Sequence, residues 1–239
     1  MSMYADSQFV IRDEIEKSHQ RAHDSFTSPG TYWNGGQRAA IADCARDARV
    51  AAGLQRPIRE EFDKSVLPQA AVRVAEQVAV DTKNVGRDFF EEAQDAGLSE
   101  GQYVETVGVV SRLVNNDVFA RGVGLPVRPL GQVKSGDATG KTPKTATIEG
   151  AWVRTIPAGN KGAEEAKYVY GDAAEGAPFI FRSLSLSPDE ARSLVDLINN
   201  QYSTMSGMMN LDFTYDPGIT RAQVELLAAR VSAINECFY

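Results

Sequence analysis

The stretch that decides the fold lies at the C-terminal end of the sequence and reads PGITRAQVELLAARVSAINECFY, residues 217–239. Its first part has the pattern of a helix N-terminus, because Thr220 can cap the first turn and Gln223 can reach back to the N–H of the cap. The apolar residues that follow have the spacing of one buried helical face. They are Val224, Leu227, Ala228, Val231 and Ile234. The stretch therefore predicts a helix that leads directly to Cys237.

Capped amphipathic patterns of the same kind recur along the chain. Ser99 and Gln102 form a second capping pair, and Ser187 and Glu190 form a third, with a proline in the first turn between them. Residues 1–126 contain no sustained alternation of apolar and polar side chains, which is the pattern typical of strands. The sequence therefore predicts an all-α fold.

The composition changes between two predicted helical parts. Residues 1–126 read as a helical domain, residues 127–177 are rich in Gly, Pro, Lys and Thr and read as a connector, and helical patterns return in residues 178–239. A weak internal repeat links the two helical parts. It aligns Gly35, Arg38, Ala39 and Ala45 with Gly218, Arg221, Ala222 and Ala228. We interpret residues 178–239 as the N-terminal part of a second copy of the first domain.

Composition and charge exclude several classes of protein. A net charge of −7 over 239 residues disfavours a general binder of nucleic acid or of anionic membranes, because either would need a basic face. Two cysteines do not make a secreted disulfide scaffold of this size. The first residues lack the pattern of a signal peptide, and no apolar run approaches the roughly 20 residues of a membrane span. We expect a cytoplasmic protein.

Three further patterns are weak candidates for chemistry. His19 and His23 lie four apart on one predicted helix, but no third metal ligand accompanies them, and we expect two solvated histidines. Residues 135–142 imitate a phosphate-binding loop, but Pro143 follows where its helix should begin. Cys44 lies in the middle of a predicted helix and reads as a small packing residue. We therefore expect no metal and no cofactor.

The decisive stretch resembles the redox motif of a known superfamily. Glu225, eleven further residues and then Cys237-Phe238-Tyr239 resemble the start of the motif E-x11-C-x-x-C-x3-H of the alkylhydroperoxidase D-like, carboxymuconolactone decarboxylase superfamily. Residues 36–42, 98–105 and 185–188 are similar to helix starts of the same superfamily. The resemblance implies a helical domain without the redox motif in the first part and a partial second domain in the last.

The resemblance also implies a function. In that superfamily two cysteines alternate between dithiol and disulfide while they reduce a hydroperoxide, and a glutamate and a histidine relay protons. It implies a thiol-dependent peroxidase with Cys237 and Glu225 as catalytic residues, a hydroperoxide as substrate, a thiol reductant, and a homo-oligomer. A continuous helix would place Glu225 about 18 Å along the axis from Cys237, so a relay needs the chain to turn back.

The second cysteine and the histidine of the motif would lie beyond Tyr239. We therefore expect little turnover from residues 1–239 and a complete site in a longer product, with cysteine or selenocysteine at position 240. Selenocysteine is encoded by UGA, which ordinary translation reads as stop; a deliberate truncation and a true stop are the alternatives. A further alternative is a non-catalytic helical protein that oligomerises through the last helix. Carboxymuconolactone decarboxylation is more distant, because it does not use this cysteine motif.

Overall fold

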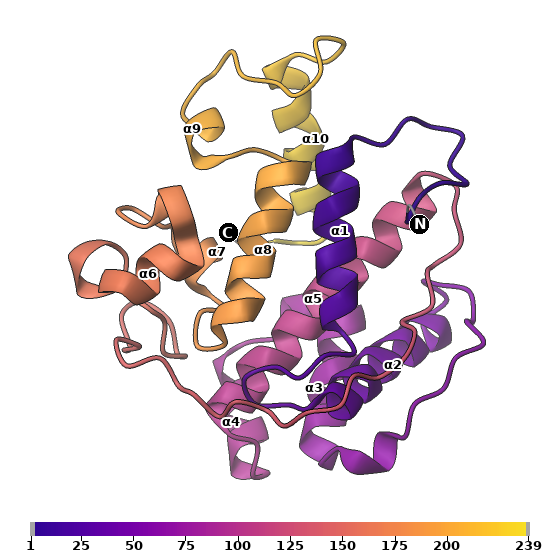
Figure 1. The fold of residues 1–239 in the computed structure, drawn as a ribbon, viewed down its shortest axis with the longest axis vertical. Coiled ribbons are helices and arrows are strands. Elements are labelled where there is room, and N and C mark those ends of the chain that lie inside the picture. The colour runs from indigo at the N-terminus through magenta and orange to yellow at the C-terminus, as the bar shows by residue number, and fades with distance from the viewer. Residues whose placement is uncertain (1–2, 238–239) are drawn as a thin grey trace.

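The protein is all-α in the computed structural model, which describes residues 3–237 and contains no β-strand in that range (Figure 1). The predicted fold class is confirmed. The α-helices are α1 (Asp13–Ser25), α2 (Gly35–Ala51), α3 (Gln69–Val80), α4 (Arg87–Asp95), α5 (Glu100–Gly122), α6 (Ala163–Tyr170), α7 (Phe179–Arg182), α8 (Pro188–Gln201), α9 (Met205–Met208) and α10 (Arg221–Ile234). Short 3-10 turns are η1 (Lys64–Val66), η2 (Thr82–Asn84), η3 (Gly159–Lys161) and η4 (Gly171–Ala173).

The long helix α5 is the centre of the fold, and it packs against α1, α2, α3 and α8 (Figure 1). It begins at the predicted capping box, in which Ser99 Oγ accepts from the N–H of Gln102 and Gln102 Oε1 accepts from the N–H of Ser99. Trp33 packs beside its first turns, and its Nε1 donates to the Gln102 carbonyl and to Thr106 Oγ1 at 3.1 Å each. Trp33 is 1% exposed and anchors the loop before α2 on the start of α5.

The predicted connector, residues 127–177, is more ordered than its composition suggests. It contains α6, which packs on α8, and an isolated antiparallel bridge between Thr147 and Thr155. Ile156 and Tyr170 are buried, and the Tyr170 hydroxyl donates to the Ile156 carbonyl at 2.6 Å. The hydrophobic core runs through all three predicted segments, so the connector contributes to the packing of the helices around it.

A completely buried network of charged side chains joins α2, α5 and α8. Arg38 Nη1 lies 2.5 Å from Glu105 Oε1, and Arg38 Nη2 lies 2.7 Å from Glu190 Oε1. Arg112 binds the other oxygen of Glu190 and donates to the hydroxyls of two serines, Ser25 and Ser193, at 2.9 Å each. Each charge therefore has an opposite charge as partner, which buried ions require.

This network overturns the capping box predicted at the start of α8. Ser187 is the N-cap residue, but its side chain makes no capping hydrogen bond and donates instead to Thr31 Oγ1 at 3.2 Å. Glu190 does not reach back to the cap, because its carboxylate is held by the guanidinium groups of Arg38 and Arg112. Charge-assisted hydrogen bonds are stronger than a single bond to a backbone N–H, so the tertiary partners prevail over the local one.

The last helix begins as predicted but is not buried. Thr220 and Gln223 form the predicted capping box at the start of α10. The predicted buried stripe is wrong, because no residue of α10 is buried. Its most exposed large apolar side chains are Leu226, Leu227, Val231 and Ile234. The spacing of apolar residues shows that one face of a helix is apolar, but it does not show that another element covers that face.

Candidate functional site

Cys237 lies just beyond the end of α10, where the backbone turns. Asn235 is the C-cap, and Glu236 follows with a φ of +51°, the left-handed conformation. The N–H of Cys237 donates to the Ser232 carbonyl at 2.9 Å, and the N–H of Glu236 donates to the Ala233 carbonyl at 3.3 Å. This pair of bonds is the Schellman pattern that ends many helices, usually with glycine in the left-handed position. The helix therefore ends before Cys237 without the glycine or proline that would have revealed it in the sequence.

Cys237 is exposed and lines a wide cleft of about 1260 Å³. The cleft lies between α10 and the body of the protein, and it is lined by residues of α1, α3, α5 and α10. Apolar side chains from all four of these helices line it. They include Ile15, Val78, Val80, Val114, Val118, Phe119 and Val231. Cys237 is thus an exposed cysteine at a cleft that also has apolar lining residues.

Glu225, the second predicted catalytic residue, lies near the other end of α10. Its carboxylate accepts from the hydroxyl of Tyr202 at 2.7 and 2.8 Å and pairs with Arg221 at 2.5 Å. Burial and the Glu225 carboxylate raise the pKa of Tyr202, so its hydroxyl is a stable proton donor to that carboxylate. The structure thus brings Glu225 together with Tyr202 and Arg221, and it does not bring Glu225 to Cys237. Sequence reasoning missed the contact with Tyr202, because the two residues lie 23 positions apart.

Cys44, the other cysteine, has an environment opposite to that of Cys237. It is buried in α2, and burial raises its pKa to about 11. Since the thiolate is the nucleophilic form, a thiol with this pKa is nearly all unreactive at neutral pH. Cys44 does not line the cleft of Cys237. The predicted packing role of Cys44 agrees with this burial.

The two histidines of α1 differ from the predicted solvated pair. His19 is fully buried, with its Nδ1 2.6 Å from the Tyr4 hydroxyl and its Nε2 on Gln201. Burial lowers the pKa of His19 to about 4, so the ring is neutral at physiological pH. His23 is half-buried. Within residues 3–237, no group of three or more His, Cys, Asp or Glu side chains is placed to hold a metal ion.

Comparisons of the chain with protein-family models, with curated proteins and with solved structures find no match in any of the three. No helix in the described part of the chain has both the length and the apolar character needed to cross a membrane. The resemblance to the alkylhydroperoxidase D-like superfamily therefore stays a prediction.

Proposed function

We propose that this protein is a thiol-dependent peroxidase in which Cys237 reduces an organic hydroperoxide. The observation that carries the proposal is the position of Cys237, an exposed thiol at the edge of a wide cleft with apolar walls. An organic hydroperoxide combines an apolar body with a polar peroxide group. The body fits the valine-rich wall of the cleft while the peroxide faces the sulfur and the solvent.

The reaction needs the thiolate of Cys237 and an external thiol. The sulfur attacks one peroxide oxygen, the O–O bond breaks, and the leaving alkoxide takes a proton to become an alcohol. Cys237 is then a sulfenic acid. An external thiol attacks the sulfenic sulfur and releases water to form a mixed disulfide, and a second external thiol restores Cys237 and leaves as a disulfide. Two electrons pass from two thiols to one hydroperoxide in each cycle.

The partners of the reaction follow from the two cysteines of the chain. Cys44 is too deeply buried to resolve a sulfenic acid on Cys237. Turnover of residues 1–239 therefore depends on a reductant from solution, and we expect it to be slow beyond the first equivalent of peroxide. Direct proton transfer needs hydrogen-bonding distance, and Glu225 makes its contacts with Tyr202 and Arg221 instead. We assign the chemistry to Cys237 and keep the relay role of Glu225 as a prediction.

The test is a single-turnover oxidation followed by mass spectrometry. One equivalent of cumene hydroperoxide should convert Cys237 to a sulfenic acid that dimedone traps, and faster than hydrogen peroxide does at equal concentration. Cys44→Ser should behave as the wild type, and Cys237→Ser should trap no dimedone. Val118→Lys places a charge in the apolar wall and should remove the preference for the organic hydroperoxide. Oxidation no faster than that of free N-acetylcysteine would refute the proposal.

A second candidate function is a non-catalytic role in assembly, and the exposed face of α10 favours it. A helix of 14 residues is marginally stable in water when nothing packs against it, and no residue of α10 is buried. Leu227, Val231 and Ile234 are each more than half exposed. A partner that covers this face would stabilise the helix and bury apolar surface. A second copy of the chain, joined through the same face, is the partner that we expect.

A further inference from the structure

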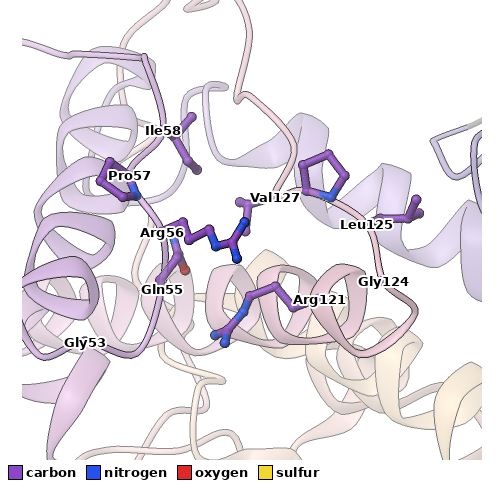
Figure 2. A pocket seen from close by; sticks show the side chains of 10 residues that line it. Gly53, Gln55, Arg56, Pro57, Ile58, Arg121, Gly124, Leu125 and Val127 are labelled. Carbon is purple, nitrogen blue, oxygen red and sulfur yellow. The ribbon is translucent and has the colours of Figure 1, made fainter.

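A second cleft lies at the C-terminal ends of α2 and α5. It has a volume of about 850 Å³ and is bounded by residues 53–58, which follow α2, and by residues 121–127 at the C-terminal end of α5 (Figure 2). None of its lining residues also lines the cleft of Cys237. Half of the lining is apolar and comes from Pro57, Ile58, Leu125, Pro126 and Val127.

The charge of this cleft is opposite to the charge of the protein. Arg56 and Arg121 both line it, and Figure 2 shows their side chains reaching toward one another from the two sides of the cleft. No acidic residue is among its lining residues. Within residues 3–237 neither arginine forms an ion pair; Arg121 donates to the Leu54 carbonyl, and Arg56 is exposed. The chain has a net charge of −7, yet at this cleft two guanidinium groups lie without a carboxylate partner. Together they form a local site for an anion.

A buried amide at the same cleft also lacks partners. Gln55 is 7% exposed, and in the described part of the chain neither its Oε1 nor its Nε2 has a hydrogen-bond partner. A buried amide without partners is costly, and such groups in native structures call for an explanation such as a ligand. Gln55 lines the cleft next to Arg56, so its Nε2 is a further hydrogen-bond donor at the same cleft.

The C-terminal ends of α2 and α5 favour an anion with a single negative charge. Both α2 and α5 end at this cleft, and the C-terminal end of a helix carries a partial negative charge. That charge opposes a dianion more than a monoanion. We infer that the cleft binds a small organic monocarboxylate, with the carboxylate on Arg56 and Arg121 and the apolar body against Ile58 and Leu125. This site is separate from the proposed peroxidase chemistry and does not depend on it.

Benzoate is a suitable probe, because it joins a carboxylate to a flat apolar ring. Binding is measured by isothermal titration and by ligand-observed NMR at low salt, with benzyl alcohol as the neutral analogue and phenyl phosphate as the dianionic one. We expect benzoate to bind more tightly than either. Arg56→Gln and Arg121→Gln should each weaken benzoate binding about tenfold, the usual scale for losing one charge-assisted hydrogen bond near the surface.

Three controls keep the result interpretable. Arg230→Gln removes an exposed arginine of α10 that does not line the cleft, and it should leave benzoate binding unchanged. Arg121→Lys keeps the charge, so retained binding would show that the loss in Arg121→Gln is not caused by unfolding, which circular dichroism also checks. Cys237→Ser should bind benzoate as the wild type does. Benzoate binding no tighter than that of benzyl alcohol, weaker than that of phenyl phosphate, or equal in Arg56→Gln and the wild type would overturn the inference.

Discussion

Arg38 and Glu105 form an ion pair that is removed from solvent, with 2.5 Å between Nη1 and Oε1 and side chains 2% and 0% exposed. Gly30 lies directly beside the pair, and a Cβ at that position would stand 2.0 Å from Glu105 Oε1. Because a buried charge is costly once its partner moves away, the close approach of Gly30 is a requirement of the network. The absence of a side chain at Gly30 thus lets the charges of α2 and α5 meet.

Gly30→Ala should destabilise the protein by about 2–4 kcal/mol, because the added methyl group overlaps the carboxylate and separates the ion pair. Urea unfolding at pH 7 measures the change in the free energy of unfolding. Gly122→Ala is the matched control, since a Cβ at that position meets no atom within 4 Å, and it should be neutral or slightly stabilising. Equal effects of the two substitutions would contradict the account of Gly30.

Glu190→Gln should cost about 3–5 kcal/mol of stability, because it removes the buried carboxylate charge that pairs with Arg112 and Arg38. Burial alone would raise the pKa of Glu190, but Arg112 and Arg38 hold it below its usual range, so the carboxylate is charged in the folded state. Glu164→Gln is the matched control, since Glu164 pairs with Lys167 at the surface and should contribute less than about 1 kcal/mol. A loss similar to that of the control would show that the buried charges are not coupled.

His19 should make the protein less stable in mild acid. Its pKa is lowered by burial to about 4 in the folded state, against 6.5 when unfolded, so the unfolded chain binds the proton first as the pH falls. Stability is full above pH 6.5 and is lost as the pH falls toward 4. From pH 7 to pH 5 the loss from this residue is about 2 kcal/mol.

Urea unfolding of the wild type and His19→Asn at pH 7 and pH 5 tests this linkage. The variant should be less stable at pH 7, because it disturbs the contacts with Tyr4 and Gln201, but its stability should fall less between the two pH values. His23, whose pKa is also lowered by burial, contributes in the same direction and leaves a residual slope. An unchanged slope in His19→Asn would be evidence against a buried neutral ring.

The two thiols should differ strongly in reactivity. In the native protein at pH 8, a disulfide reagent such as DTNB should label Cys237 rapidly, because this thiol is exposed. Cys44 should be labelled only after unfolding, because it is buried and its pKa is raised to about 11. The rapid phase should be absent from Cys237→Ser and intact in Cys44→Ser. Rapid labelling of two thiols in the native state would mean that α2 opens readily.

The exposed face of α10 should cause self-association. Light scattering at micromolar concentration should show an oligomer, and Leu227→Glu combined with Val231→Glu should shift it to a monomer, because two charges would have to be buried. Ala229→Glu, on the opposite side of the helix, should leave the oligomer intact. A stable monomer of the wild type would remove the support for the assembly role.

The sequence by itself determined the all-α fold class and the starts of α5 and α10. The capping pairs at Ser99 and Thr220 and the packing of Cys44 follow from local sequence, and the structure contains all of them. Such features depend on residues within four positions of one another, or on side chains too apolar to face water. The chemistry of Cys237 was also proposed from sequence, but through a resemblance, and it awaits its experiment.

Only the tertiary structure decided where the charges and the apolar faces go. Arg38, Glu105 and Glu190 are 67 or more positions apart along the chain, and no local pattern pairs them. Glu190 has the spacing of a capping residue, yet two guanidinium groups hold it more strongly than one N–H could. The packing of the elements decides whether the apolar face of α10 is covered and whether Glu225 reaches a thiol. The spacing of apolar residues at 3.6 per helical turn carries no information about which elements pack together.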